Sequence, residues 1–200
     1  MVAAGVNPRV RLGRLVGMTN APRVGARPQK PGEGLSPAFT GQGRSFEDFY
    51  RAELPGLVVL ARALAPPGLA EDVAQEAMMV AYRRWSTIRE LQHPEAYVRR
   101  TCANLAVSQF RRRLAEARAF RRSGAPQIVD QLGGTGEFWQ LVRSLPRRQA
   151  QVVALHYVFD LSVADVARTL QVSQGSVKVH LSRARQSLAR TIGLPMEVES

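Results

Sequence analysis

The chain has 200 residues and a formal net charge of +12, and 45% of its residues are hydrophobic. These values fit one or two modest domains that bury a core, and the basic surplus fits a polyanionic partner. The single cysteine, Cys102, excludes an intrachain disulfide framework and a cysteine-rich zinc site. No apolar run approaches the length of a membrane span or of a signal-peptide core, which favours a cytoplasmic protein without a membrane partner.

Residues 1–44 differ in composition from the remainder, since they contain eight Gly and five Pro and carry seven Lys or Arg against one acid. Such a segment buries too little apolar surface to order itself, and we predict a disordered basic extension. Two interpretations stay open. The extension is either a basic arm that adds loose affinity for DNA or an unselected addition, and in the latter case Met18 could even be the true start.

Charge is unevenly distributed along the following residues. Residues 45–96 carry five Lys or Arg against eight Asp or Glu, whereas residues 97–122 carry eight against one. An acidic block beside a basic one indicates two different partners for one domain, one of them a polyanion. The arginine runs at 111–113 and 121–122 favour nucleic acid as that polyanion.

Residues 45–122 are predicted to form one all-helical domain. Ser45 precedes acidic residues and is suited to cap a first helix, and Pro66-Pro67-Gly68 ends it. Pro94 is favourable in the first turn of a later helix. We expect helices over residues 46–65, 70–85 and 94–122.

Residues 137–192 are predicted to form a second all-helical domain, which ends in a helix-turn-helix. The Gly-rich residues 123–136 lack periodicity and are predicted to be a flexible linker. Ser162 and Ser173 are suited to cap the last two helices, and the turn between them is too short for antiparallel packing. We expect helices over residues 137–144, 147–159, 162–170 and 173–188, followed by a tail at 193–200.

The last predicted helix carries polar side chains mostly off its apolar stripe, where a helix inserted into a DNA groove needs hydrogen-bond donors. This pattern alone also fits regulators of other kinds, which bind duplex DNA without a polymerase. The candidate DNA-binding residues here are Gln174, Ser176, Lys178, Val179, His180 and Arg183.

The predicted helix over residues 70–85 has two distinct faces. Apolar side chains between Val73 and Ala81 recur at helical spacing and predict a stripe that faces the core. The other face is either an ordinary solvated surface or a contact surface for a partner. Its residues, at i, i+3, i+4 and i+7, are Asp72, Gln75, Glu76 and Met79.

Taken together, these segments resemble the extracytoplasmic-function group of the sigma-70 family, initiation factors of bacterial RNA polymerase. The resemblance is carried by AEDVAQEA…AYRRW at 70–85, PEAYVRRTCANLAVSQFRRR at 94–113 and LPRRQAQVVALHYVFDLSVADVARTLQVSQGSVKVHLSRARQSL at 145–188. Each half is moderately specific alone, whereas both in this order, across a short linker, are highly specific. The resemblance implies a factor that directs core polymerase to promoters, recognises their −10 and −35 elements and assists melting.

The resemblance makes residues 45–122 region 2 of such a factor. The helix over 70–85 would dock on the clamp helices of the largest polymerase subunit, through Asp72, Gln75 and Glu76. The helix that starts at Pro94 would capture unpaired bases of the −10 element, with arginines on phosphates. The candidate residues for −10 binding are Tyr97, Arg100, Asn104, Arg111 and Arg112, and Arg99 and Arg113 are further candidates for phosphate contacts.

Two of these assignments have structural alternatives. Asn104 also fits a helix-surface or capping asparagine, because its amide both donates and accepts hydrogen bonds. Tyr97 and Trp85 are first interpreted as core aromatics, and Tyr97 is the better candidate for stacking on a base.

The resemblance makes residues 137–192 region 4, which implies contacts with the polymerase flap and with the −35 element. The final helix would enter the major groove, with Arg183 and Arg185 on phosphates. Many relatives have Ser-Arg where this chain has Val179-His180, so a guanine-reading arginine is missing there. Family members are often held by anti-sigma proteins, so such a partner is also implied.

The sequence contains no nucleophile–base constellation, no metal-ligand cluster and no glycine-rich phosphate loop. We therefore expect no enzymatic activity, no cofactor and no small-molecule substrate. The main alternative to a sigma factor is a helix-turn-helix regulator that acts without polymerase, which would need neither the acidic face at 70–85 nor the helix at 94–113.

Overall fold

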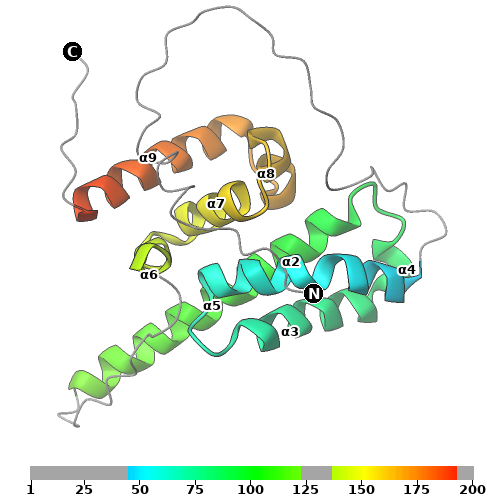
Figure 1. Cartoon of the computed structure of the whole chain (residues 1–200), viewed down its shortest axis with the longest axis horizontal. Helices are drawn as coiled ribbons and strands as arrows, with labels where there is room; N and C mark the ends of the chain where they lie inside the picture. The colour runs from blue at the N-terminus through cyan, green and yellow to red at the C-terminus, as the bar shows by residue number, and fades with distance from the viewer. Residues whose placement is uncertain (1–44, 123–136, 193–200) are drawn as a thin grey trace, which may run out of the picture. The chain divides into compact units, whose positions relative to one another are not determined.

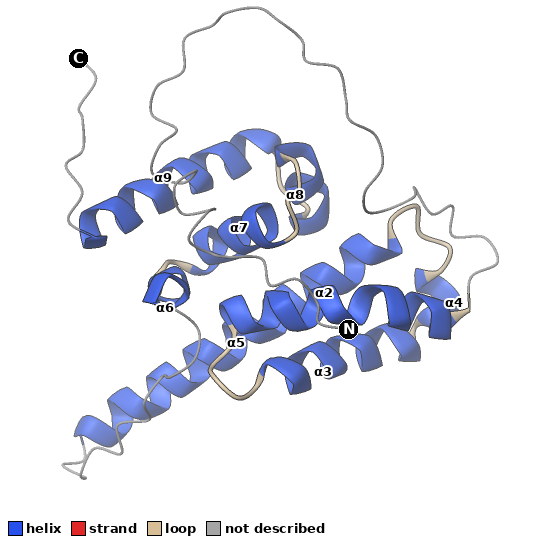
Figure 2. Cartoon of the chain, in the orientation of Figure 1, coloured by secondary structure: helices blue, strands red, loops and turns tan. Residues whose placement is uncertain are grey.

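A computed structural model of the chain describes residues 45–122 and 137–192. The predicted N-terminal extension, linker and tail lie outside the described residues. The described part consists of helices and loops and contains no strand (Figure 2), which confirms the all-α class. The first four helices are α2 (Phe46–Leu64), α3 (Ala70–Arg83), α4 (Trp85–Ile88) and α5 (Pro94–Arg122).

Helix α2 begins where the sequence predicts it. The Ser45 hydroxyl oxygen accepts a hydrogen bond from the Asp48 backbone N–H at 3.1 Å, and it donates to Asp48 Oδ2 at 2.6 Å. This reciprocal cap satisfies one of the free N–H groups of the first turn. The helix ends before Pro66, as expected for a residue that cannot continue it.

Helix α3 ends two residues earlier than predicted. Arg84 has φ −119° and ψ 18°, outside the helical region, and the short helix α4 starts at Trp85. The Trp85 ring packs against Phe46 and Phe49 of α2, with ring centroids 5.4 and 4.9 Å apart. Trp85 is therefore held by aromatic packing, and its side chain is partly rather than fully buried.

Helices α2, α3 and α5 pack pairwise against one another (Figure 1). Many of the buried side chains are small, which lets the helix axes approach closely. Phe49, Leu57 and Met78 are fully or almost fully buried and fill the remaining space. The buried alanines of this core include Ala61, Ala74, Ala77, Ala81, Ala103 and Ala106.

The second group of helices contains the predicted helix-turn-helix. Ser162 caps its first helix as Ser45 caps α2, and Ser173 accepts from the Ser176 backbone N–H at 3.1 Å. Between the helices, Gln171 adopts the left-handed conformation, with φ 55°, which closes the end of the first helix. The group consists of α6 (Glu137–Ser144), α7 (Arg147–Val158), α8 (Val163–Leu170) and α9 (Gln174–Ile192).

The apolar stripe of α9 faces α7 and α8, as its periodicity predicts. Val177 and Ala184 are fully buried, and Leu181 and Leu188 are almost so. Polar residues between them are consequently directed away from the core. This orientation is the local requirement for a helix that presents side chains to a ligand.

The two helix groups also contact each other. Helix α2 contacts α6 and α7, and helix α5 contacts α7 and α8. The sequence does not predict these contacts. They determine the surroundings of several candidate residues described below.

Candidate polymerase and nucleic-acid interfaces

Helix α3 presents an acidic face. Asp72, Gln75 and Glu76 are exposed, while Val73 and Ala77 on the opposite side are buried. Within the described residues, neither carboxylate of this face has an ion-pair partner. The neighbouring Glu71 differs, because its carboxylate accepts a hydrogen bond from Arg62 at 2.6 Å, which lowers the pKa of Glu71.

The acidic face continues into exposed apolar surface. Met79 is 48% exposed and Tyr82 is 59% exposed. The Tyr82 ring lies on Phe46, with ring centroids 4.9 Å apart. The sequence reasoning did not select Tyr82 as a contact residue, although it follows Gln75 by seven residues and Met79 by three. An interface with an apolar centre and charged neighbours is typical of protein partners.

Helix α5 carries the predicted −10 residues on one side. Tyr97, Arg100, Asn104 and Arg111 are separated by three, four and seven residues, so they share a face. The first three are partly buried and Arg111 is exposed. Arg112, next to this face, is exposed and donates to Glu116 at 3.1 Å.

Asn104 contacts helix α7. Its side-chain oxygen accepts hydrogen bonds from Arg147 Nη2 at 2.7 Å and from Gln151 Nε2 at 2.8 Å. Gln151 is fully buried, and its own side-chain oxygen accepts from Arg148 at 3.2 Å. Asn104 is therefore a hydrogen-bonded residue between helices in this state of the molecule.

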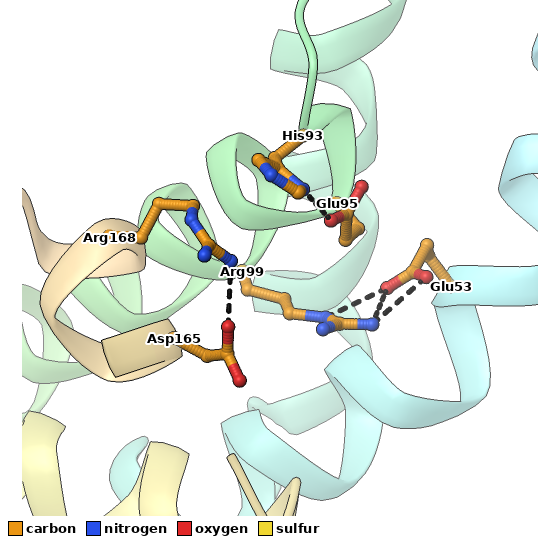
Figure 3. A network of polar contacts seen from close by, with 6 residues as sticks. All are labelled: Glu53, His93, Glu95, Arg99, Asp165 and Arg168. Carbon is orange, nitrogen blue, oxygen red and sulfur yellow. Dashed lines mark hydrogen bonds and ion pairs between the residues drawn. The ribbon is translucent and has the colours of Figure 1, made fainter. Parts of the chain in front are cut away.

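The sequence predicts a phosphate contact for Arg99, but in the structure this side chain forms an ion pair inside the chain. Its guanidinium donates to both carboxylate oxygens of Glu53, at 3.0 and 3.1 Å, and lies 4.5 Å from the centre of the Phe159 ring. The two charged side chains are only 14% and 12% exposed. Figure 3 shows this bidentate pair beside the His93–Glu95 pair at the start of α5 and the Asp165–Arg168 pair of α8. Arg99 thus has a structural role.

Helix α9 presents its candidate residues in two ways. Gln174, Lys178 and Val179 are exposed, and Arg183 is exposed one turn further on. Ser176 is partly buried, and its hydroxyl is within 2.9 Å of the Ser173 hydroxyl. The exposed side chains are therefore the ones free to reach base edges or phosphates.

His180 and Arg185 have neighbours in other helices or turns. Burial, together with the charges of Arg183 and Arg148, lowers the pKa of His180, which keeps its imidazole neutral at pH 7. Arg185 donates to the Tyr157 hydroxyl at 3.2 and 3.3 Å, yet it remains exposed. Arg185 is thus oriented before any ligand binds, whereas the buried Nδ1 atom of His180 has no hydrogen-bond partner within the described residues.

Residues 45–122 and 137–192 contain no group of three His, Cys, Asp or Glu side chains arranged to hold a metal ion. None of the helices in these ranges has the length and apolar character needed to span a bilayer.

Comparison with known proteins identifies two matched regions in the chain. The family model for sigma-70 region 2 matches residues 49–116, and the model for sigma-70, region 4 matches residues 135–188. The RNA polymerase sigma-E factor of Streptomyces coelicolor is 30% identical over 148 residues, which cover 72% of this chain and 84% of that protein. The ECF RNA polymerase sigma factor SigM of Mycobacterium tuberculosis is 28% identical over 173 residues, which cover 84% and 88%.

A solved structure has a similar fold. It is the sigma factor RpoE from Bartonella quintana, determined in complex with the anti-sigma factor NepR. It has a TM-score of 0.57 and 23% sequence identity, and the match covers 76% of this chain and 98% of that chain.

The all-helical fold and the two matched regions define a sigma factor, a protein of promoter-specific transcription initiation. The chain belongs to the extracytoplasmic-function group of the sigma-70 family, which confirms the resemblance found in the sequence. This family consists of transcription initiation factors.

Proposed function

We propose that this sigma factor binds core RNA polymerase through α3 and reads the promoter with α5 at the −10 element and α9 at the −35 element. In this proposal it acts in the cytoplasm and has no catalytic activity of its own. The observation that carries the proposal is the separation of charge, since α3 exposes unpaired carboxylates whereas α5 and α9 expose arginines.

The polymerase contact rests on the face formed by Asp72, Gln75 and Glu76. Carboxylates without an internal partner are available to pair with basic groups on another protein. Met79 and Tyr82 add apolar area next to them, which a protein partner buries and nucleic acid does not require.

The −10 contact rests on the shared face of α5. Tyr97 supplies a ring suited to stacking on an unpaired base, and Asn104 supplies an amide that reads a base edge. Arg100, Arg111 and Arg112 supply positive charge for the backbone of the strand. Together they fit a single strand better than a closed duplex.

The −35 contact rests on the exposed N-terminal half of α9. Gln174, Lys178 and Val179 point outward where recognition helices meet base edges, and a neutral His180 both donates and accepts hydrogen bonds. Arg183 and Arg185 extend along the helix toward phosphate positions.

Transcription in vitro with core polymerase on a randomised promoter library tests this function. We expect selected promoters to share two short elements at −10 and −35 spacing. Asn104→Ala should relax selection only at −10 positions, and Lys178→Ala only at −35 positions, by about 1–3 kcal/mol for the base concerned.

Arg185→Ala is the matched control for this experiment, because loss of a phosphate contact weakens all sequences alike and reduces the salt dependence of binding. Transcription without any shared element would contradict the proposed promoter reading. An equal loss on all sequences for the three variants would contradict the assignment of Asn104 and Lys178 to bases.

A further inference from the structure

The C-terminal part of α5 is an exposed basic helix end. Residues 111–122 contain six Arg against one Glu. None of the described side chains in this range is buried, and only Leu114 is partly buried. Figure 1 shows these turns running past the ends of α2 and α3. This part of the helix therefore does not serve to complete the core.

A single line of side chains runs along α5 from the proposed −10 residues to the end of the helix. Successive members are seven residues apart, which is almost two full turns, and the last two are four residues apart. The members are Tyr97, Asn104, Arg111, Arg118 and Arg122. The face proposed to read the −10 element thus continues into Arg118 and Arg122, which we call the distal arginines.

The distal arginines have no charged partner inside the described part of the chain. Both are exposed, and neither forms an ion pair within residues 45–122 and 137–192. The one carboxylate of this helix end, that of Glu116, pairs with Arg112 at 3.1 Å. Unpaired guanidinium groups on an exposed helix are suited to bind phosphate oxygens.

Stabilisation of the helix itself does not explain this arrangement. Cations in the last turn of a helix interact favourably with its dipole, and the effect falls off within that turn. It accounts for Arg122 but not for Arg111 or Arg118, which precede the last turn.

The composition of the line favours nucleic acid over a protein partner. Between the arginines, this side of the helix carries the small Ala115, and the exposed Phe120 lies on the opposite side. Protein interfaces have an apolar centre, which α3 supplies with Met79 and Tyr82 and which the line lacks from Arg111 onward. Arginines without an apolar centre are typical of contacts with a phosphate backbone.

The geometry of the helix sets the distance between the distal arginines and the −10 bases. At a rise of about 1.5 Å per residue, Arg118 and Arg122 lie about 21 and 27 Å from Asn104 along the helix axis. Along a DNA duplex these lengths correspond to about six to eight base pairs, at about 3.4 Å each. The chain continues from α5 to the helices proposed to read the −35 element, which places the distal arginines on the upstream side.

We propose that Arg118 and Arg122 bind the phosphate backbone of the double-stranded spacer between the two promoter elements, about six to eight base pairs upstream of the base read by Asn104. This position rests on the proposed role of Asn104 at the −10 element. Both arginines lie beyond residues 49–116, which match sigma-70 region 2. The contact strengthens promoter binding without reading sequence.

Holoenzymes assembled with full-length variants test the proposal. Arg118→Ala/Arg122→Ala removes both proposed contacts. Ala117→Arg/Arg118→Ala is the charge-matched variant, because it keeps the composition of the helix and moves one guanidinium by about 100° around its axis. Ala117 is exposed, so this position accepts the longer side chain.

Fluorescence anisotropy measures binding to a promoter duplex that carries the selected −10 and −35 elements. We expect the slope of log K against log salt to fall by about 1.8 for the double removal and by about 0.9 for the charge-matched variant. For the double removal, the affinity ratio of wild type to variant should then fall about twelvefold between roughly 50 and 200 mM salt. Circular dichroism checks the helix, and the charge-matched variant carries the test if the double removal unfolds it.

A second duplex locates the contact. Its spacer phosphates at the proposed position are replaced by neutral methylphosphonates. This duplex should bind the wild-type holoenzyme more weakly than the unmodified duplex does, whereas the double removal should bind both duplexes equally.

A charge-matched variant that binds like the wild type would show that only net charge matters, and this result would overturn the proposal. Equal weakening of the wild type and the double removal by neutral phosphates would do the same. Gel filtration with core polymerase covers the remaining class of partner. Loss of complex formation by either variant would assign the line to the enzyme and would also overturn the spacer contact.

The proposed −10 role has its own readout, which is −10 selection by the Asn104→Ala holoenzyme. If that selection is impaired while neutral phosphates affect all proteins alike, the spacer contact alone is wrong. If that selection is unchanged, the −10 role of Asn104 is wrong and the proposed position of the spacer contact falls with it.

Discussion

Cys102 lies on the buried side of α5, where its Sγ atom is 3.6 Å from the Leu57 carbonyl oxygen. Burial raises the pKa of this thiol from 9.0 to about 12. A thiol in apolar surroundings is protonated, and it is neither a nucleophile nor a metal ligand at neutral pH. The residue is therefore a small packing residue of the core, as its alanine-rich neighbourhood in the sequence indicates.

This raised pKa predicts a specific alkaline destabilisation. Below pH 9 the thiol is protonated in both the folded and the unfolded chain. Between pH 9 and 12 only the unfolded chain releases the proton, so the free energy of unfolding falls as pH rises. Urea unfolding at pH 8 and pH 10 should show that the wild type loses about 1 kcal/mol more than Cys102→Ala. Parallel losses in the two proteins would contradict a buried protonated thiol.

Asn104 and Arg99 show that the role of a residue depends on its contacts with residues that are distant in the sequence. Arg99 has the same side chain as Arg100 and lies next to it, yet Arg99 pairs with Glu53 in a nearly water-free position. Bidentate pairing and partial burial favour a fixed geometry over binding to a mobile phosphate. Arg99 is therefore fixed inside the chain, whereas no such ion pair is seen for the adjacent Arg100 among the described residues.

At the scale of the element, α3 is an amphipathic helix with one buried face and one exposed face. Its buried side is built from small residues that pack on α2 and α5, which fixes the helix as a rigid support. Its exposed side presents Asp72, Gln75 and Glu76. A rigid backbone beneath these side chains limits the conformational entropy lost on binding a partner.

Charge reversal on this face should abolish polymerase binding. For Asp72→Arg/Glu76→Arg we expect a loss of about 2–5 kcal/mol in binding to core polymerase, because unpaired basic groups would then face each other. Gel filtration of the mixed proteins measures complex formation, and circular dichroism checks the fold. Glu71→Arg is the control, since this nearby carboxylate pairs with Arg62 inside the chain. Unchanged complex formation by the double variant would exclude α3 as the contact.

The helix-turn-helix illustrates how local signals build a functional element. Ser162 and Ser173 cap α8 and α9, and each cap satisfies a backbone N–H that the helix itself leaves free. Gln171 accepts the left-handed conformation between them although it carries a side chain, and its N–H donates to the Arg168 carbonyl oxygen at 3.3 Å. The turn is therefore stabilised by capping bonds rather than by glycine.

At the scale of the whole molecule, the proposed function places two DNA-reading elements on one chain, and we expect each to bind weakly alone. When polymerase holds two such elements at a fixed separation, binding of the first raises the effective concentration of the second. Affinity and selectivity then belong to the holoenzyme.

We therefore expect the free full-length chain to bind a selected promoter at least about a hundredfold more weakly than the holoenzyme does. Anisotropy titrations with the promoter duplex and with a randomised duplex, at one salt concentration, measure affinity and selectivity together. A free chain that binds as tightly and as selectively as the holoenzyme would contradict this division of labour.

The sequence by itself determined the positions of the helices, their caps and the family, because these depend on residues within a few turns of one another. The serine caps, the apolar periodicity of α9 and the motif segments are all local patterns. Only the tertiary structure decided that α3 stops at Arg83, where aromatic packing holds Trp85, and that Asn104 bonds to Gln151 and Arg99 to Glu53. The partners in these last two pairs are 47 and 46 residues apart, and the packing of helices, not any local preference, brings them together.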